Sequence, residues 1–347
     1  MDHTHRACVG PRPVELTRLG YGGAPIGNLL APVSDDDAQG ALQAAWDAGI
    51  RYYDTAPWYG LGLSEHRVGQ FLRDKPKAEY VLSTKVGRLL KPWPARYGPS
   101  LRFNPWAEAL QFDVRFDYSY DGIIRAYEDS LQRLGLPEVD MLLIHDLDRF
   151  YHSPESSYQA RLGQLASGGF AALRDLRADG KIGAIGAGVN RPGTITDMLD
   201  RCELDLFLVA GPYTLVDQEI LSTELARCQE AGVRVVIGAA FHHGLLATGV
   251  RRREPSSLAS VDAVTLDRIA RLEDACDRWR VSLPAVALQF PAAHPAVAAV
   301  VFGGTGAEQV EQAIAGFGAD IPAELWEDLK SQKLLPADAP VPAASIT

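Results

Sequence analysis

Short apolar runs alternate along the chain with longer segments in which apolar residues recur at helical spacing. The apolar runs are continuous, which is typical of strands that are buried on both faces of a parallel sheet. We predict eight strands, at residues 20–25, 50–54, 80–85, 141–145, 182–189, 204–210, 233–239 and 298–303. We predict eight helices between and after them, at residues 35–48, 64–73, 120–134, 170–179, 194–202, 218–231, 264–279 and 307–316.

Local signals at the helix ends support these boundaries. Ser34 precedes three aspartates, and its hydroxyl can accept hydrogen bonds from the first free amides of the helix at 35–48. Gly49 follows the same helix, where a residue in left-handed geometry commonly ends the last turn. Ala38 and Leu42 share one face of the helix, which we expect to pack against the sheet.

The repeated strand–helix unit predicts the fold. Eight such units favour a closed (β/α)8 barrel, the TIM barrel, which commonly forms a single domain of this size. We expect the barrel to span residues 14–334 and a tail rich in proline and alanine to follow at 335–347. The alternative is a doubly wound open sheet. That fold usually carries a G-x-G-x-x-G phosphate loop, which neither glycine-rich segment, 20–23 or 183–188, matches.

One connection departs from the regular repeat. The segment 88–118, between the third strand and the third helix, is much longer than a usual loop. It holds the aromatic residues Trp93, Tyr97, Phe103, Trp106, Phe112, Phe116 and Tyr118. Because aromatic residues are scarce in disordered segments, we interpret it as a long, ordered, functional loop.

Composition and charge narrow the function classes. The 347 residues carry a formal net charge of −10, which argues against nucleic-acid binding because that requires basic patches. The N-terminus lacks the apolar core of a secretory signal, and the most apolar stretch, 285–302, is too interrupted to span a membrane. The four cysteines are scattered and match no metal or redox motif, which is typical of free thiols in a reducing compartment. We therefore expect a cytoplasmic protein without a metal site.

Chemically capable side chains stand where the predicted strands end. Asp54, Lys85, His145 and Asn190 end or follow four different apolar runs, and Tyr59 lies on the loop after Asp54. All strands of a (β/α)8 barrel open their C-terminal ends on one face, where the active sites of such enzymes lie. Each residue alone has an ordinary structural explanation, such as packing or solvation. Their coincidence at neighbouring strand ends favours a shared catalytic site.

The proposed acid–base role of Tyr59 depends on groups that shift the pKa of its phenol. A phenol has an unperturbed pKa of about 10 and is a poor acid or base near neutral pH. A cation held beside the phenol lowers that pKa, and Lys85 is the candidate cation.

Several motifs resemble those of the aldo-keto reductase superfamily, and the resemblance runs from about residue 16 to residue 329. The motifs are Asp54-x-x-x-x-Tyr59-Gly60, Ser83-Thr84-Lys85, Leu143-Ile144-His145, residues 180–186 and Asn190. Residues 186–190 and 244–249 resemble the branch that contains D-threo-aldose 1-dehydrogenases, L-fucose dehydrogenases and L-galactose dehydrogenases. One form of pyridoxal 4-dehydrogenase is similar to that branch.

This resemblance implies an oxidoreductase that moves a hydride to or from a nicotinamide cofactor. Tyr59 would act as general acid in reduction and as general base in oxidation. Lys85 would lower the pKa of Tyr59, and Asp54 would orient Lys85 and keep it charged. His145 would donate a hydrogen bond to the substrate oxygen, and Asn190 would hold the carboxamide of the nicotinamide.

The positions that would contact the cofactor depart from the family pattern. Many relatives have a glutamine where this chain has Ala210, and many stack an aromatic ring on the nicotinamide from the position of Gly238. NADP-preferring relatives often carry Lys or Arg after the eighth strand, whereas residues 302–309 hold no cation and include Glu308. We therefore expect NAD to be preferred, with NADP as a possible second cofactor. The expected cofactor contacts are Asn190, Tyr213, Gly238, Phe241, Gly303, Gly304, Thr305 and Gln309.

The leading functional hypothesis is an aldose 1-dehydrogenase. It would oxidise a sugar hemiacetal of the L-fucose, L-galactose or D-arabinose type to its lactone. The sugar would lie against aromatic residues, for which Trp58, Phe103, Trp106 and Phe116 are the candidates. The alternatives are a pyridoxal 4-dehydrogenase, a general aldehyde or ketone reductase, and a nucleotide-sensing regulatory subunit. The sequence leaves the substrate, the direction and the oligomeric state open.

Overall fold

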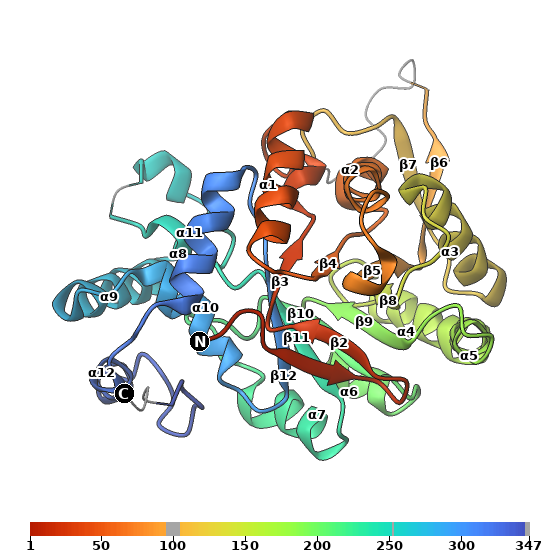
Figure 1. The fold of residues 1–347 in the computed structure, drawn as a ribbon. Coiled ribbons are helices and arrows are strands. Elements are labelled where there is room, and N and C mark those ends of the chain that lie inside the picture. The colour runs from red at the N-terminus through yellow and green to blue at the C-terminus, as the bar shows by residue number, and fades with distance from the viewer. Residues whose placement is uncertain (95–104, 252, 344–347) are drawn as a thin grey trace.

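Eight parallel strands close into a barrel (Figure 1). The computed structural model describes residues 1–94, 105–251 and 253–343. The barrel strands are β3 (Leu19–Gly22), β4 (Tyr52–Asp54), β5 (Val81–Val86), β8 (Met141–His145), β9 (Ala184–Val189), β10 (Leu206–Ala210), β11 (Arg234–Gly238) and β12 (Val297–Phe302). Around the barrel their order is β10-β11-β12-β3-β4-β5-β8-β9, so strands consecutive in the chain lie side by side. The eight predicted strands and the predicted TIM barrel are confirmed.

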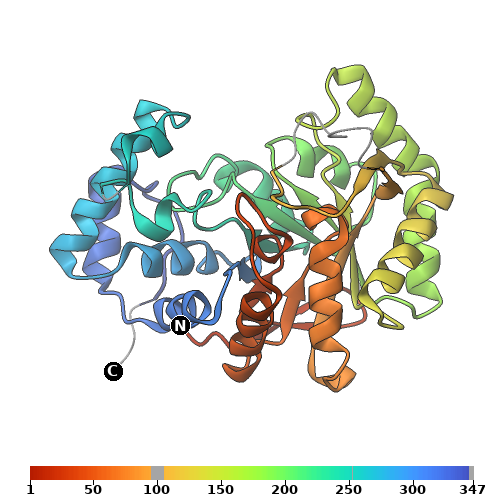
Figure 2. The ribbon, with the colours of Figure 1, turned by 90° about the horizontal axis from the view of Figure 1, so that it is seen from above.

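Helices cover the outside of the barrel (Figure 2). The eight predicted helices correspond to α1 (Asp35–Asp47), α2 (Leu63–Leu72), α3 (Tyr120–Leu134), α5 (Phe170–Ala178), α6 (Thr194–Leu199), α7 (Ala226–Glu230), α9 (Ala263–Trp279) and α11 (Ala307–Gly318). Ser34 caps α1 as expected, because its hydroxyl accepts a hydrogen bond from the Asp37 amide at 3.0 Å. α7 is shorter than predicted because a π-helical turn, Leu221–Leu225, takes up the first part of the predicted segment.

In the described part of the chain, four further α-helices are not predicted by the sequence pattern: α4 (Glu155–Gln164), α8 (Leu245–Thr248), α10 (Leu283–Ala292) and α12 (Ala323–Ser331). α10 shows one physical reason. Every residue of α10 except Pro284 is buried, so the helix has no polar face and no amphipathic period. Its Gln289 is satisfied internally, since Nε2 donates hydrogen bonds to the carbonyls of Gly316 and Ala319.

A β-hairpin closes the N-terminal end of the barrel. Its strands, β1 (Arg6–Val9) and β2 (Val14–Thr17), pair antiparallel. Val9, Val14 and Leu16 join the hydrophobic cluster that also holds the first residues of β8, β9 and β10. The barrel can therefore open only at its C-terminal end, where the last residues of the strands lie.

The long aromatic segment after β5 is a second hairpin rather than an irregular loop. β6 (Arg88–Pro92) and β7 (Phe112–Phe116) pair antiparallel and stand beside α3 (Figure 1). Backbone pairing between the two ends of the segment therefore positions its aromatic residues. Phe103 lies outside the described residues.

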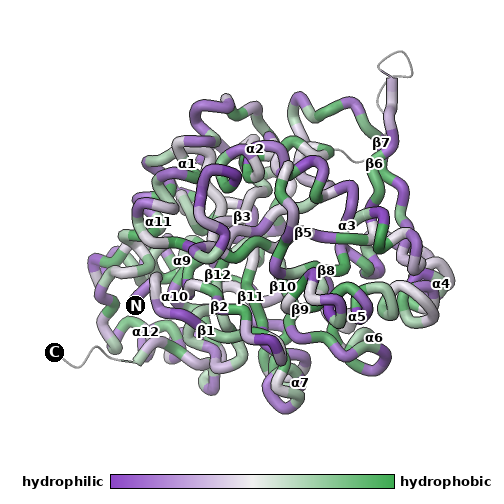
Figure 3. Tube along the Cα trace, turned by 45° about the vertical axis from the view of Figure 1, so that its right-hand side comes forward, coloured by the Kyte–Doolittle hydropathy of each residue, from purple (hydrophilic) through white to green (hydrophobic). Residues whose placement is uncertain are grey.

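Hydrophobic residues concentrate in the central strands, as the green colour of β9 to β12 shows (Figure 3). The predicted tail from residue 335 begins with buried side chains, since Leu335 is 2% exposed and Ala339 is 1% exposed. Its first part therefore packs against the helices. Within the described ranges, no helix is long and apolar enough to cross a bilayer.

Candidate active site

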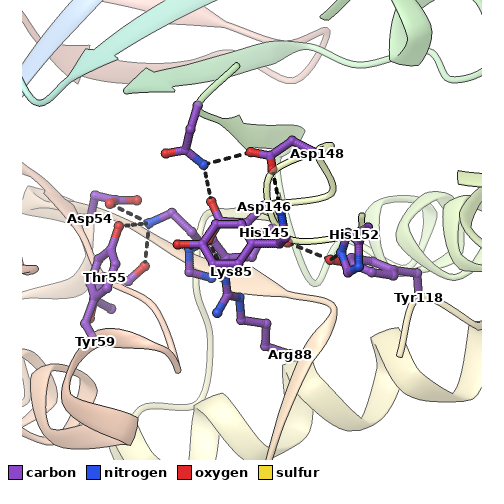
Figure 4. Close-up of polar contacts among 12 residues, drawn as sticks. Asp54, Thr55, Tyr59, Lys85, Arg88, Tyr118, His145, Asp146, Asp148 and His152 are labelled. Carbon is purple, nitrogen blue, oxygen red and sulfur yellow. Dashed lines mark hydrogen bonds and ion pairs between the residues drawn. The ribbon is translucent and has the colours of Figure 1, made fainter. Parts of the chain in front are cut away.

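Lys85 is the centre of a buried polar cluster at the C-terminal end of the barrel (Figure 4). Its ammonium Nζ donates hydrogen bonds to Asp54 Oδ2 at 2.6 Å, to the Thr55 carbonyl at 3.0 Å and to the Tyr59 hydroxyl at 3.1 Å. The other carboxylate oxygen of Asp54 accepts a hydrogen bond from Ser83 at 2.7 Å. With its three donors engaged, Lys85 is held in one orientation. The Tyr59 hydroxyl accepts from Lys85, so its own proton must point elsewhere.

The chain reaches this geometry through a tight turn after β4. The Thr55 amide donates to the Ser83 carbonyl at 2.9 Å, and the Tyr59 amide donates to the Ala56 carbonyl at 3.1 Å. Gly60 follows with a φ of 66°, and a side chain there would place Cβ 2.5 Å from the Gly27 carbonyl oxygen. A glycine after the tyrosine therefore lets the turn pack against the loop after β3.

Burial and charge act in opposite directions on Tyr59. Burial raises its pKa above the ordinary value of about 10, and the positive charge of Lys85 opposes this rise without reversing it. Lys85 therefore acts on the phenol in the predicted direction, but the net direction is opposite to the prediction. Burial also disfavours the charged form of Lys85, yet the charges and hydrogen bonds of Asp54 and Tyr59 outweigh it and raise the lysine pKa. Lys85 is therefore a permanent cation.

His145 ends β8 beside the phenol. Its ring centroid lies 5.9 Å from that of Tyr59, and the two rings are nearly perpendicular. Burial, followed by the charges of Arg88 and Lys85, lowers the histidine pKa well below its usual range, so the ring is neutral. Nε2 lies 3.3 Å from Asp146 Oδ2, and Nδ1 is buried without a hydrogen-bond partner among the described residues. The role of His145 as a hydrogen-bond donor to the substrate oxygen therefore stays a prediction.

Asn190 is held by two carboxylates. Its Nδ2 donates to Asp146 Oδ1 at 2.6 Å and to Asp148 Oδ2 at 3.0 Å. Both amide protons are therefore used, and Oδ1 is left as a hydrogen-bond acceptor. An acceptor fixed in this way fits the NH2 group of a nicotinamide carboxamide.

Residues that the sequence analysis missed complete this part of the site. Arg88 forms a buried ion pair with Asp146, and Asp148 is fully buried. The available signals were weak: Asp146 directly follows His145, and Arg88 stands near Lys85 in a segment that reads as a loop. Neither position shows from sequence alone that the side chain turns toward the barrel.

The structure brings two of the predicted substrate residues to Tyr59. A backbone bridge between Leu29 and Trp106 holds the Trp106 ring 5.6 Å from Tyr59 and 5.8 Å, edge to face, from Trp58. Phe116 lies elsewhere, 4.5 Å from the ring of His152. Trp106 therefore lies beside the phenol, with Trp58 packed against Trp106, whereas the ring of Phe116 contacts that of His152.

The predicted cofactor residues near the ends of β10 and β11 do not all face the inside of the barrel. Tyr213 is fully buried with its ring against Phe290 and His294, so the structure does not bring it to the site. Its distance from the end of a strand does not reveal whether a side chain faces inward or outward. A Cβ at Gly238 would lie 3.1 Å from the side chain of Leu208, which places this glycine on the inner face of the barrel. Phe241 packs partly buried against the core.

The segment after β12 leads into α11. The Gly304 carbonyl accepts a hydrogen bond from the Tyr21 hydroxyl at 2.7 Å, and the Thr305 amide donates to Gln309 Oε1 at 2.9 Å. A Cβ at Gly303 would collide with the ring of Pro25 at 2.4 Å. No side chain caps the first turn of α11, so its amides suit a phosphate group. Among the described residues, no group of three or more His, Cys, Asp or Glu could hold a metal ion.

The chain is similar over nearly its whole length to proteins of known activity. The Aldo/keto reductase family profile matches residues 18–333. The chain is 41% identical to a pyridoxal 4-dehydrogenase of Microbacterium luteolum, covering 96% of this chain and 98% of the relative. It is 40% identical to a D-threo-aldose 1-dehydrogenase of a Pseudomonas species, with 92% and 95% covered. The solved holo structure of an aldo-keto reductase from Bacillus halodurans superposes with a TM-score of 0.72 at 25% identity, covering 99% of each chain.

The relatives and the geometry agree on the class of chemistry. The two relatives named above are dehydrogenases, and a phenol beside a buried ammonium suits proton transfer coupled to hydride transfer. The suspected resemblance is therefore confirmed. The chain belongs to the aldo/keto reductase family and is an oxidoreductase that uses a nicotinamide cofactor and acts on small-molecule substrates.

Proposed function

We propose that this enzyme is an NAD-preferring aldose 1-dehydrogenase that oxidises the cyclic hemiacetal of a sugar to its lactone. The observation that carries the proposal is the Tyr59 hydroxyl, which accepts a hydrogen bond from Lys85 at 3.1 Å. A base placed in this way is ready to take the proton of the anomeric hydroxyl. The candidate sugars are of the L-fucose, L-galactose or D-arabinose type.

The residues of the chain handle the proton. Tyr59 takes the hydroxyl proton as the carbonyl of the lactone forms, and Lys85 stabilises the negative charge on the phenolate that accepts it. Asp54 keeps Lys85 charged and in place through its 2.6 Å hydrogen bond. The nicotinamide cofactor, when bound, supplies the acceptor for the hydride that leaves the anomeric carbon.

Two ends of the dinucleotide have candidate partners. Asn190 Oδ1 would accept a hydrogen bond from the carboxamide, because both protons of its amide are engaged by Asp146 and Asp148. The uncapped amides at the start of α11 would hold a phosphate of the dinucleotide. NAD is favoured over NADP because Glu308 in the first turn of α11 would repel a 2′-phosphate and residues 302–309 offer no cation.

Pyridoxal is the second candidate substrate. Trp106 lies 5.6 Å from the phenol ring and packs edge to face against Trp58, and an apolar wall of this kind beside the phenol would suit a flat pyridine as well as a sugar. The 41% identity to a pyridoxal 4-dehydrogenase supports this alternative. Pyridoxal also closes to a cyclic hemiacetal, so the same proton and hydride transfers would oxidise it.

The cysteines support a cytoplasmic site of action. Cys8, Cys202, Cys228 and Cys276 are free. Free thiols persist in reducing compartments.

We propose that the partner of the active site is a small-molecule substrate.

A substrate panel tests the proposal. Formation of reduced nicotinamide is followed by absorbance with NAD or NADP and with L-fucose, L-galactose, D-arabinose or pyridoxal. We expect activity with a sugar and a higher kcat/KM with NAD. Activity with pyridoxal alone would favour the second candidate, and efficient turnover with NADP alone would refute the argument from Glu308 and residues 302–309.

The pH dependence of the rates is a separate prediction. Because burial raises the pKa of Tyr59, the deprotonated phenol is the minor form, and its fraction grows about tenfold per pH unit below the pKa. The rate of oxidation is therefore expected to rise between about pH 6 and pH 9, whereas the rate of reduction, which uses the protonated form, stays level. Initial rates in both directions measure this, and an oxidation rate that is flat over the range would contradict it.

A further inference from the structure

Arg88 is a fully enclosed cation that the proposed mechanism does not use. It begins β6 directly after Gly87 and is 2% exposed. Its guanidinium carbon lies 4.7 Å from the ring centroid of Trp58, 4.8 Å from that of Phe116 and 4.4 Å from that of Tyr151. Three aromatic rings thus fix the plane of the guanidinium.

Asp146 lies among Arg88, His145 and Asn190 and contacts all three. One carboxylate oxygen, Oδ2, pairs with Arg88 and lies 3.3 Å from His145 Nε2. The other, Oδ1, accepts the 2.6 Å hydrogen bond from Asn190. A single carboxylate therefore holds a caged arginine, the histidine and the asparagine together.

Without Arg88 this arrangement would be electrostatically unfavourable. Asn190 Nδ2 donates to Asp146 and Asp148 at once, so two buried carboxylates converge on one amide group. Like charges that share a buried site disfavour each other's ionised forms. Arg88 is the cation paired with one of them, and it allows both to remain acceptors.

We propose that Arg88 is a positioning residue that, through Asp146, holds Asn190 in the orientation that receives the nicotinamide carboxamide. This inference rests on the proposed role of Asn190 in cofactor binding. Arg88 lies in the ring cage and acts through Asp146 rather than on the cofactor itself. The same cage includes Phe116 of β7, so the residue also ties the aromatic hairpin to the cofactor site.

The test compares two ligands that differ in the nicotinamide. Dissociation constants of NADH and of ADP-ribose, which lacks the nicotinamide ring, are measured by calorimetry for the full chain. Arg88→Met is expected to weaken NADH about tenfold, because a buried charged partner is lost, and to leave ADP-ribose within about twofold. Arg149→Gln, which breaks more exposed ion pairs with Glu155 and Asp197, should change neither. Equal weakening of both ligands, or no weakening of NADH, would overturn the proposal.

Two further variants test whether Arg88 acts through Asp146, and they keep the proposal testable if Arg88→Met does not fold. Asp146→Asn keeps the shape of the side chain and is expected to show the same selective loss of NADH. In the double variant Arg88→Met/Asp146→Asn the buried charges are removed together, so the loss is expected to be no larger than in either single variant. Additive losses would mean that Arg88 acts independently of Asp146. If Arg88→Met does not fold, the ligand selectivity of Asp146→Asn alone decides.

These measurements need no turnover. An enzyme that fails to oxidise any sugar would contradict the proposed substrate and leave the comparison of NADH with ADP-ribose intact. Loss of selectivity in the binding data would instead remove the role of Arg88 while leaving the dehydrogenase activity standing.

Discussion

Replacing Tyr59 by phenylalanine is expected to reduce turnover by about 10²–10⁴-fold while leaving the affinity for NADH almost unchanged. The substitution removes only the hydroxyl, so the ring can keep its packing against Trp106 and His145. Lys85 keeps its hydrogen bonds to Asp54 and to the Thr55 carbonyl. What is lost is the atom that accepts the proton of the substrate.

The measurement pairs kcat on the best substrate of the panel with the dissociation constant of NADH. Tyr120→Phe is the matched control, because it also removes a tyrosine hydroxyl, one that donates to Asp175 at 2.9 Å on the surface of α3. The control is expected to behave as the wild type. Turnover retained in Tyr59→Phe would sink the proposed mechanism. NADH binding without turnover by the unaltered chain on any substrate would instead favour a nucleotide-sensing role.

The strand ends that carry the proposed catalytic residues are predictable from the sequence because each follows an uninterrupted apolar run. Asp54 and His145 are the last residues of β4 and β8, and Lys85 is the penultimate residue of β5. In a parallel barrel the last residue of a strand lies at the C-terminal end of the barrel, where the ends of the neighbouring strands also lie. The three therefore meet as expected, although they lie far apart in the chain.

Features that depend on tertiary enclosure are not predictable in this way. The net direction of the Tyr59 pKa follows from burial, to which Trp106 contributes from the distant aromatic hairpin. Arg88 reads as the first residue of a loop, and only the folded hairpin shows that aromatic rings surround it. Tyr213 has the expected spacing from its strand but turns to the outer core.

Replacing Lys85 by methionine is expected to lower both the stability and the activity of the enzyme. Lys85 and Asp54 form an ion pair in which the side chains are 1% and 3% exposed. Removing one partner of such a pair leaves a buried, uncompensated charge, so the free energy of unfolding is expected to fall by about 3–5 kcal/mol. Urea unfolding measures this. Lys77→Met is the control, because its pair with Asp140 is more exposed at 31% and 23% and should cost about 1 kcal/mol or less.

The double variant Lys85→Met/Asp54→Asn separates stability from catalysis. It contains no buried unpaired charge, so most of the lost stability is expected to return, since neutral replacements of a buried pair are often tolerated. Turnover is expected to stay low, because nothing then offsets the burial that raises the pKa of Tyr59 or stabilises its phenolate. A double variant that regained turnover with its stability would mean that Lys85 serves only the fold. Stability restored without turnover would assign the lysine to the chemistry, with Asp54 needed because a buried ammonium requires a counter-charge.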